Sequence, residues 1–374
     1  MNVSEPLSLL GGLSPERFMA RHWQKKPLLV RQAVTQPQAL LSRADLFDLA
    51  DRDGVESRLV EQQGAHWRLR QGPFARRALP ALKRPGWTLL VQGVDLHLQA
   101  AHDMLQRFRF APDCRLDDVM VSYATDGGGV GPHFDSYDVF LLQLQGRRRW
   151  RISRQKDLSL QTDKPLKILA HFIPEQEYLL EPGDMLYLPP RYAHEGVAMG
   201  ECMTCSIGFR APGLGELARE LLQRLADDAQ ELAGAALYRD PRQAAVSQPA
   251  QIPASVQDFA QTALQGVMAD RLALDRALGE LLTEPKHAVW FERTDDAALN
   301  SDRGVRLDRR TKMMFDDSHV FINGEAFRAG GRDASLMRSL ANERCLTHFQ
   351  ITRLGADAQD LLQQWLHAGW LHAG

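Results

Sequence analysis

The stretch GGGVGPHFDSYDVFLLQLQGRRRWRIS, residues 127–153, decides the fold. A glycine-rich loop leads into His133 and Asp135, and a run of alternating apolar residues follows at once. Because side chains at i and i+2 of a strand point to the same face, this histidine and this aspartate present a nitrogen and a carboxylate oxygen to one volume. The pattern predicts a polar pair at the entrance of a β-strand.

The residues on either side of this stretch extend the strand pattern. Short runs rich in β-branched, aromatic and apolar residues cover 117–124, 138–144, 148–153 and 203–209. Turn residues separate them, at Asp126-Gly127, Gln145-Gly146, 181–184 (EPGD) and Pro189-Pro190. Many short strands at this spacing predict a sandwich or a barrel.

A third polar residue on a late strand completes a possible metal site. Residues 182–196 read PGDMLYLPPRYAHEG, so His194 stands where that strand begins. Two histidines and one carboxylate form the facial triad of non-haem Fe(II) oxygenases, which leaves three positions for a 2-oxo acid and dioxygen. An H-x-D pair by itself is more typical of a surface turn. The glycine loop before it, the strand after it and the run ending in His194 favour the metal site.

A 2-oxo acid also needs a cation for its distal carboxylate. In the triplet 147–149, Arg148 shares a strand face with Trp150 and Ile152, whereas Arg147 and Arg149 face the other way. We therefore expect Arg148 to point inward and bind a carboxylate with two hydrogen bonds, the alternative being a solvated basic triplet. Ser122, on the strand before the glycine loop, is placed to donate a hydrogen bond to the same carboxylate.

Length and composition narrow the class of protein. A chain of 374 residues predicts two or three domains, and a net charge of −2 argues against non-specific nucleic-acid binding through bulk charge. The sequence has no transmembrane-length apolar run and no signal-peptide pattern at its start, so we expect a cytoplasmic protein without membrane contact. The four cysteines do not make a disulfide framework, and Cys202 and Cys205 are expected to be structural thiols. The glycine loop lacks the G-K-[ST] ending of a phosphate-binding loop.

After residue 212 the spacing of apolar residues changes from that of strands to that of helices. Residues 214–225 carry an amphipathic helical stripe, 239–254 are a proline-punctuated link, and 255–282 are again helical. These stripes would serve either a dimer interface or a cover for the barrel. Residues 303–374 combine helices with a hairpin at Asn323-Gly324, which predicts a winged-helix-like module. Its arginines alternate with acidic residues, which favours a solvated surface over a nucleic-acid face and leaves direct nucleic-acid contact open.

Five segments together carry a resemblance to a known family, the JmjC-type, cupin-fold oxygenases. They are 18–30 (FMARHWQKKPLLV), 131–140 (GPHFDSYDVF), 146–150 (GRRRW), 181–190 (EPGDMLYLPP) and 194–196 (HEG). Within these oxygenases, the chain most resembles the bacterial ribosomal-protein arginine hydroxylases, relatives of the ribosomal histidyl hydroxylases. One departure is Arg191, which stands where cupin-type barrels often have glycine.

The resemblance implies an architecture and a site. The architecture is α+β and multidomain: a double-stranded β-helix (cupin or jelly-roll, JmjC) barrel over 1–212, a helical dimerisation region over 213–300 and a winged-helix-like domain over 301–374. It implies Fe(II) at His133, Asp135 and His194, 2-oxoglutarate at Ser122 and Arg148 beside His133, and dioxygen as co-substrate. It favours a homodimer. Tyr137 and Asp138 would form the rim that receives a guanidinium group.

Three functional hypotheses follow. The first is an Fe(II)- and 2-oxoglutarate-dependent dioxygenase that hydroxylates an arginine side chain of a large-subunit ribosomal protein. The second is a demethylase, or a hydroxylase of another protein residue. The third is a non-catalytic, metal-binding cupin scaffold, which would have no need of an open metal site with a carboxylate-binding arginine. The sequence leaves the target residue, the stereochemistry and the affinity for oxygen undetermined.

Overall fold

The computed structural model describes residues 2–294, 299 and 303–374. The chain divides into two compact units, Met1–Ala211 and Pro212–Gly374. The boundary predicted at residues 300 and 301 lies outside the described residues, so the division of the second unit at that point stays a prediction.

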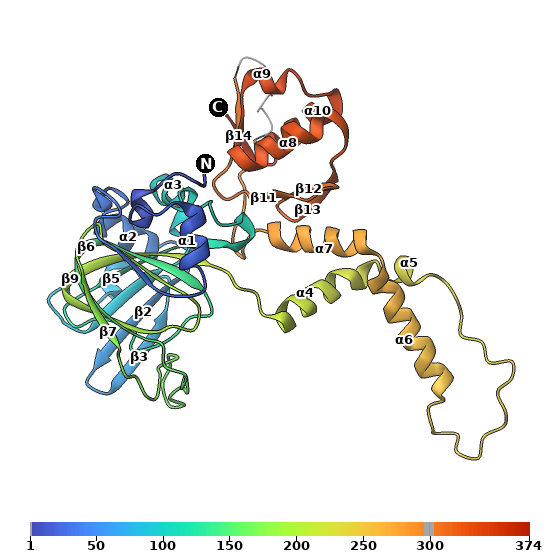
Figure 1. The fold of residues 1–374 in the computed structure, drawn as a ribbon, viewed down its shortest axis with the longest axis horizontal. Coiled ribbons are helices and arrows are strands. Elements are labelled where there is room, and N and C mark those ends of the chain that lie inside the picture. The colour runs from blue at the N-terminus through green and yellow to red at the C-terminus, as the bar shows by residue number, and fades with distance from the viewer. Residues whose placement is uncertain (1, 295–298, 300–302) are drawn as a thin grey trace. The chain divides into compact units, whose positions relative to one another are not determined.

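One antiparallel sheet forms the body of the first unit (Figure 1). Its strands run in the order β1-β8-β6-β9-β5-β4-β2-β3; β7 lies off this path and pairs with β6 on the edge that β8 also uses, opposite β9. The strands are β1 (Leu28–Val30), β2 (Ser57–Gln63), β3 (His66–Gln71), β4 (Trp87–Val91), β5 (Leu116–Ala124), β6 (Asp138–Ser153), β7 (Gln176–Leu180), β8 (Met185–Leu188) and β9 (Ala193–Phe209).

The sheet folds over on itself because β9 bends. Arg148 of β6 pairs with Ala198, whereas Ser122 of β5 pairs with Thr204, six residues further along β9. A straight strand would hold these positions about 20 Å apart. The side chains of Arg148 and Ser122 are nevertheless 3.1 Å apart, so they face each other across the interior of a barrel. The described strands form an open path rather than a closed ring, because β1 and β3 end it.

Strand β6 differs from the prediction of two strands. It is continuous over 16 residues, and its pairing with β9 shifts register around Gln143, Gln145 and Arg147. Gly146 has a φ of +63°, and a side chain there would lie 2.0 Å from the carbonyl oxygen of Glu201. The Gln145-Gly146 pair therefore makes a β-bulge that bends one strand, instead of a turn that ends it.

Helices cover the outer face of this sheet. The α-helices are α1 (Pro15–Arg21), α2 (Arg43–Ala50) and α3 (Gln99–Gln106), and the 3₁₀ turns are η1 (Ser8–Leu10), η2 (Pro37–Ala39), η3 (Arg76–Ala78), η4 (Val94–Leu96) and η5 (Asp113–Arg115). Ser14 caps α1, and Ser42 forms a capping box with Asp45 at the start of α2. Beneath them lies the main core, where Phe18, Trp87 and Tyr123 are fully buried.

The second unit begins with four helices: α4 (Leu214–Asp227), α5 (Ala229–Ala233), α6 (Ala254–Ala269) and α7 (Arg271–Thr283). The helical run predicted over 255–282 is divided at Asp270, whose side chain accepts a hydrogen bond from the Ala273 N–H and caps α7. We call residues 214–269 the helical arm, in which α6 lies beside α5 (Figure 1). No residue of α6 is buried, and the side chain of Leu264 is 61% exposed.

The remainder of this unit is the module predicted from residue 303 onward. It contains β10 (Val305–Leu307), β11 (Met313–Phe315), β12 (His319–Ile322), β13 (Glu325–Arg328), α8 (Gly331–Glu343), β14 (Cys345–Leu346), α9 (His348–Ile351), α10 (Ala356–His367) and β15 (Leu371–Ala373). The predicted hairpin is present, since Ile322 pairs with Glu325 around Asn323-Gly324. Across the described parts of both units, no helix has the length and apolar character needed to span a bilayer.

Candidate metal centre

The barrel brings together the three residues singled out as metal ligands. His133 and His194 exchange two backbone hydrogen bonds, of 2.9 and 2.8 Å, and form an antiparallel bridge between the glycine loop and the start of β9. Asp135 follows two residues after His133. Ligand atoms of all three side chains lie within 4.8 Å of one another. We call His133, Asp135 and His194 the metal triad.

Hydrogen bonds to the backbone set the orientation of both imidazoles. Nδ1 of His133 lies 2.9 Å from the carbonyl oxygen of Gly131, and Nδ1 of His194 lies 2.9 Å from that of Tyr192. An Nδ1–H that donates to a carbonyl leaves the Nε2 lone pair free for a metal. These Nε2 atoms are 4.0 and 3.6 Å from Oδ2 of Asp135, so the donor set fits a divalent ion held by two nitrogens and one oxygen.

Burial keeps one of these ligands neutral. His194 is almost completely buried, and this burial, with the neighbouring His133, lowers the pKa of its imidazole to about 4. A metal binds the neutral ring, so at neutral pH this ligand need not lose a proton first. Asp135 is 38% exposed, so the centre opens to solvent on the aspartate side.

Arg148 lies inside the barrel, as the alternation of the sequence predicts. Its Nη1 donates to Oγ of Ser122 at 3.1 Å and to Oγ1 of Thr204 at 3.4 Å, and its Nη2 donates to the carbonyl oxygen of Gly196 at 3.2 Å. Its Cζ lies 5.0 Å from the ring centroid of Trp150. We call these five residues the Arg148 cradle.

The cradle has no anion of its own. Among the residues that the structure describes, every hydrogen-bond acceptor around Arg148 is neutral and its buried Nε has no hydrogen-bond partner. Burial lowers the pKa of this guanidinium. In the described part of the chain, no carboxylate lies within ion-pair distance of it. A buried cation is normally compensated, so an anion from outside the chain would complete the charge balance of this cradle.

The two residues predicted at the substrate rim have different environments. Tyr137 is 43% exposed, and burial together with the charge of Asp117 raises the pKa of its hydroxyl, which places the phenol beside acidic groups. Asp138 is fully buried, contrary to its predicted place on the rim. Its carboxylate accepts hydrogen bonds from Tyr187, Gln24 and Arg115, at 2.6, 3.1 and 3.0 Å. All three partners belong to the fold, so Asp138 holds the barrel together and cannot receive a guest.

The departure at Arg191 has a structural counterpart. Its φ is +62°, in the left-handed region that favours glycine and costs other residues roughly 1 kcal/mol or more. The backbone N–H of Arg191 donates to the carbonyl oxygen of Asp135 at 2.7 Å, and its guanidinium lies 5.9 Å from the ring of Phe134. These contacts offset the strain and tie the loop before His194 to the loop that carries Asp135.

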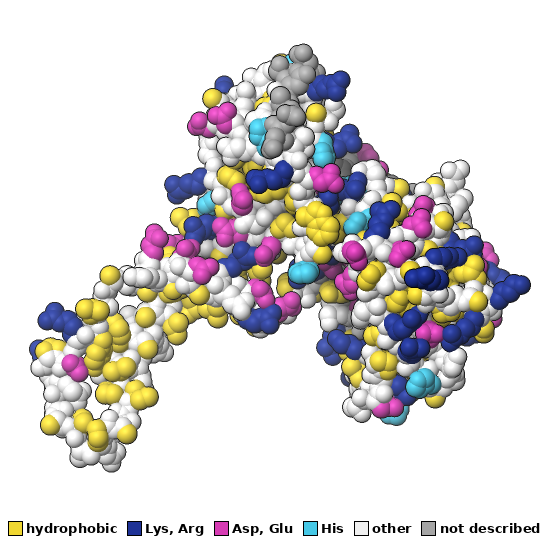
Figure 2. Space-filling view, turned by 180° about the vertical axis from the view of Figure 1, so that it is seen from behind, with side chains coloured by type: hydrophobic (Ala, Val, Ile, Leu, Met, Phe, Trp, Pro, Cys, Tyr) yellow, Lys and Arg dark blue, Asp and Glu magenta, His cyan; other side chains and the backbone are white. Residues whose placement is uncertain are grey.

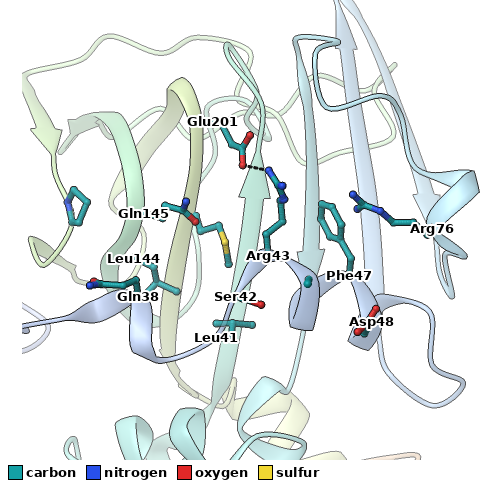
Figure 3. A pocket seen from close by; sticks show the side chains of 13 residues that line it. Gln38, Leu41, Ser42, Arg43, Phe47, Asp48, Arg76, Leu144, Gln145 and Glu201 are labelled. Carbon is teal, nitrogen blue, oxygen red and sulfur yellow. Dashed lines mark hydrogen bonds and ion pairs between the residues drawn. The ribbon is translucent and has the colours of Figure 1, made fainter.

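A separate hollow lies on the opposite face of β9 (Figure 3). Its volume is about 940 Å³, and residues of α2, β6 and β9 line it. Met203, which lines it, alternates along the strand with Thr204 of the cradle, so the two residues face opposite sides of the sheet. The ion pair between Arg43 and Glu201 lies within this hollow. None of the residues predicted for the site lines it.

Sequence reasoning missed three members of the cradle. Thr204 is the cross-strand partner of Ser122, but nothing in the sequence gives that register. Trp150 and Gly196 are also cross-strand partners. The tryptophan was used only to show which way Arg148 points, and the glycine only as part of the HEG motif. Alternation along β6 could have suggested the tryptophan; the other two depend on how β9 pairs with its neighbours.

Comparison with known proteins supports one family. Residues 103–217 match the JmjC domain and residues 266–372 match the ROXA-like winged helix. The chain is 33% identical to the ribosomal protein uL16 3-hydroxylase of Escherichia coli over 343 residues, 88% of this chain and 89% of that protein.

The same likeness holds in three dimensions. The crystal structure of E. coli YcfD superposes with a TM-score of 0.83 at 29% identity, covering 96% of this chain and 98% of that one. A second structure of YcfD, a ribosomal oxygenase, in complex with cobalt and 2-oxoglutarate superposes with a TM-score of 0.78 at 29% identity, over 96% and 97% of the two chains.

Proposed function

This chain belongs to the JmjC-domain ribosomal oxygenase family, and on that premise we propose that it hydroxylates an arginine side chain of a large-subunit ribosomal protein. The reaction would use Fe(II), 2-oxoglutarate and dioxygen. The observation that carries this proposal is the pairing of an open metal triad with a buried arginine that lacks an anion. A scaffold protein has no use for that pairing.

The residues would divide the work as follows. His133, Asp135 and His194 would hold the iron, and the Arg148 cradle would hold the distal carboxylate of 2-oxoglutarate, with Ser122 donating a hydrogen bond to it. When bound, the iron and its co-substrates supply the oxidation: one oxygen atom enters a C–H bond of the target, the other enters succinate, and carbon dioxide leaves. The chain itself contributes orientation and the exclusion of water from the barrel interior.

The acidic rim supports an arginine as the target residue. The phenol of Tyr137 lies in the field of Asp117, Asp118 and Asp135, which the single cation Arg210 opposes, so a guanidinium guest would find there an aromatic face in a mainly negative setting. Since Asp138 is buried, Tyr137 is the rim residue that this proposal keeps. The inference of a ribosomal substrate rests on the similarity to the E. coli ribosomal protein uL16 3-hydroxylase. A ribosomal target also implies that the enzyme works in the cytoplasm.

Mass spectrometry of ribosomal proteins tests the function. The purified chain, supplied with Fe(II), 2-oxoglutarate and air, should add the mass of one oxygen atom to one arginine-containing peptide and release an equal amount of succinate. His133→Ala is the matched inactive control, because it removes one metal ligand and leaves the cradle intact. Loss of methyl-group mass would instead establish a demethylase. If no ribosomal protein changed in mass, the proposal of a ribosomal substrate would be refuted.

We further propose that two copies associate through the helical arm. Figure 2 shows hydrophobic side chains gathered along this arm. On α6, Val256, Phe259 and Leu264 are 37%, 37% and 61% exposed, and their spacing puts them on one helical stripe. An exposed apolar stripe of this length is typical of a protein–protein interface.

Sedimentation equilibrium measures this association. Leu264→Asp should weaken the dimer by about tenfold or more, because it places a charge on the apolar stripe. Gln265→Asp adds the same charge one position away, off the stripe, and should leave the association constant unchanged. A wild-type chain that stays monomeric at micromolar concentration would end the proposal.

A further inference from the structure

The Arg148 cradle contains two residues whose role nothing in the triad explains. We propose that Trp150 and Gly196 are positioning residues that fix the Arg148 guanidinium for the distal carboxylate of 2-oxoglutarate. This inference rests on the proposed function, because it specifies how the same site prepares itself for its co-substrate.

Trp150 acts as a platform. Its side chain is only 5% exposed, so the indole ring is fixed by packing against the apolar interior of the barrel. The guanidinium lies over this ring at 5.0 Å, and the ring centroid of His194 is 5.9 Å from that of the indole. One rigid ring thus touches both the arginine that would bind the carboxylate and a residue that would bind the metal.

Gly196 provides space. A β-carbon on this residue would lie 2.7 Å from Nε of Arg148 and 2.7 Å from Cζ3 of Trp150. Real β-carbons do not come so close, and neither neighbour can yield cheaply, since the indole is packed and Nε lies midway along its side chain. The backbone of Gly196 is not left-handed. The position therefore requires glycine because of the room it leaves, and an alanine there would not strain the chain itself.

The carbonyl of the same glycine completes the arrangement. It accepts a hydrogen bond from Nη2, while Ser122 and Thr204 accept from Nη1. The hydroxyl of Thr204 in turn donates to Oε1 of Gln143 at 3.1 Å, which leaves its lone pairs for the guanidinium. With one face on a ring and two nitrogens tethered, the side chain of Arg148 has little freedom left to lose when a carboxylate binds. Such preorganisation raises affinity without adding a contact to the ligand.

Alanine at position 196 tests the inference, and position 208 offers a matched control. Both glycines lie on β9 with backbones outside the left-handed region, but a β-carbon at Gly208 would meet its nearest atom at an ordinary 3.6 Å. The experiment is calorimetric titration of 2-oxoglutarate into the full chain loaded with cobalt(II), without turnover. Gly196→Ala should weaken 2-oxoglutarate by about tenfold or more, the cost of misplacing one charged hydrogen bond, and Gly208→Ala should leave it unchanged.

A shorter ligand distinguishes positioning from general damage. 2-Oxobutyrate offers the same keto acid to the metal but has no distal carboxylate for Arg148. Its affinity should be equal in wild type and Gly196→Ala, as should the affinity for cobalt(II) itself. Equal weakening of both keto acids would overturn the inference, because it would show a distorted metal centre rather than a displaced guanidinium.

A second substitution, Trp150→Phe, should partly restore the affinity that Gly196→Ala loses. Phenylalanine at position 150 lacks the Cζ3 and Cη2 atoms that an alanine methyl at 196 would strike, the latter at 2.8 Å. Trp150→Phe alone should weaken 2-oxoglutarate about threefold through loss of part of the platform. In the double variant it should recover part of the affinity lost in Gly196→Ala. Full additivity of the two changes, or wild-type affinity in Trp150→Phe, would contradict the proposal.

These outcomes separate the inference from the function on which it rests. If the wild-type chain failed to bind 2-oxoglutarate, the proposed function would fail first. If the wild type bound it and both variants at 196 and 208 bound it equally well, only the positioning roles would be lost.

Discussion

Two arginines, the buried Arg148 of the first unit and the half-buried Arg310 of the second, differ in whether the chain supplies a carboxylate to compensate their charge. In the second unit, Arg310 donates from Nε and Nη2 to the two carboxylate oxygens of Asp308, at 2.7 and 2.9 Å, and His372 adds a further contact at 2.7 Å. In the first unit, Arg148 is more deeply buried, yet its partners are a serine, a threonine and a peptide carbonyl. One charge is compensated by the chain, and the other is not.

The difference separates structural charges from functional ones. Removing a buried charge from water costs several kcal/mol, and a protein usually recovers this cost through an opposite charge at close range. The Asp308–Arg310 pair recovers it within the fold and so contributes stability. Arg148 has only neutral partners in the free chain, so under the proposed function an anion such as the distal carboxylate of 2-oxoglutarate would supply the missing compensation and gain binding energy from it.

The sharpest test of this comparison is Arg148→Met, which keeps the bulk of the side chain and removes the charge. Affinity for 2-oxoglutarate should fall by about 100-fold or more, since two charge-assisted hydrogen bonds are lost. Thermal stability should stay equal or rise, because an uncompensated buried cation disappears. Calorimetric titration and thermal melting of the same sample measure both. A destabilised variant would mean that the charge is compensated after all.

The opposite result is expected in the second unit. Asp308→Ala removes a buried carboxylate with its hydrogen bonds from Arg310 and His372 and should lower the free energy of unfolding by about 2 kcal/mol. Affinity for 2-oxoglutarate should not change, because the first unit contains the entire cradle. Denaturant unfolding of the full chain, together with the same titration, checks both statements. A loss of 2-oxoglutarate affinity would show that the pair is not purely structural.

Asp138 offers a test of whether a charged residue of this barrel is structural because it is ion-paired, or functional because it lies on the same strand as Arg148. It lies on the strand that carries Arg148, yet it is paired with Arg115 and bonded to Tyr187. Asp138→Asn retains hydrogen-bonding capacity and removes the charge, so we expect a stability loss of about 1–2 kcal/mol and an unchanged 2-oxoglutarate affinity. If Asp138→Asn lost affinity for 2-oxoglutarate but kept its stability, the location of a charge on β6 would matter more than its ion pairing.

The smallest expected effect is a pH dependence of the folding stability that comes from the Asp308–Arg310 pair. Burial alone would raise the pKa of Asp308, but hydrogen bonds from Arg310 and His372 outweigh it and hold that pKa well below its usual range. A lowered folded-state pKa contributes stability above the unfolded value, about 3.9, and loses it as the pH falls toward the folded value. Wild type should therefore lose roughly 1 kcal/mol more than Asp308→Asn when the pH falls from about 5 to 3. Parallel pH profiles would show that Asp308 is not specially stabilised.

Local patterns were sufficient for much of the site. Alternation along one strand put His133 with Asp135 and turned Arg148 inward, because strand geometry fixes which neighbours share a face. The hairpin predicted at Asn323-Gly324 was likewise local, since it depends on a few adjacent residues. The position of Asp138 was predicted wrongly because its partners, such as Gln24 and Tyr187, come from distant segments.

The sequence by itself determined the identity of the groups: two imidazoles, a carboxylate, an inward arginine and the glycine loop that delivers them. Only the tertiary structure determined which residues surround these groups. The bend of β9 sets Ser122 and Thr204 against Arg148, denies that arginine a carboxylate, and places Gly196 where no side chain fits. Such facts depend on which strands pair and in what register. Register between strands far apart in the chain depends on how the apolar patterns of all of them match at once, so the stretch around the metal ligands does not contain it.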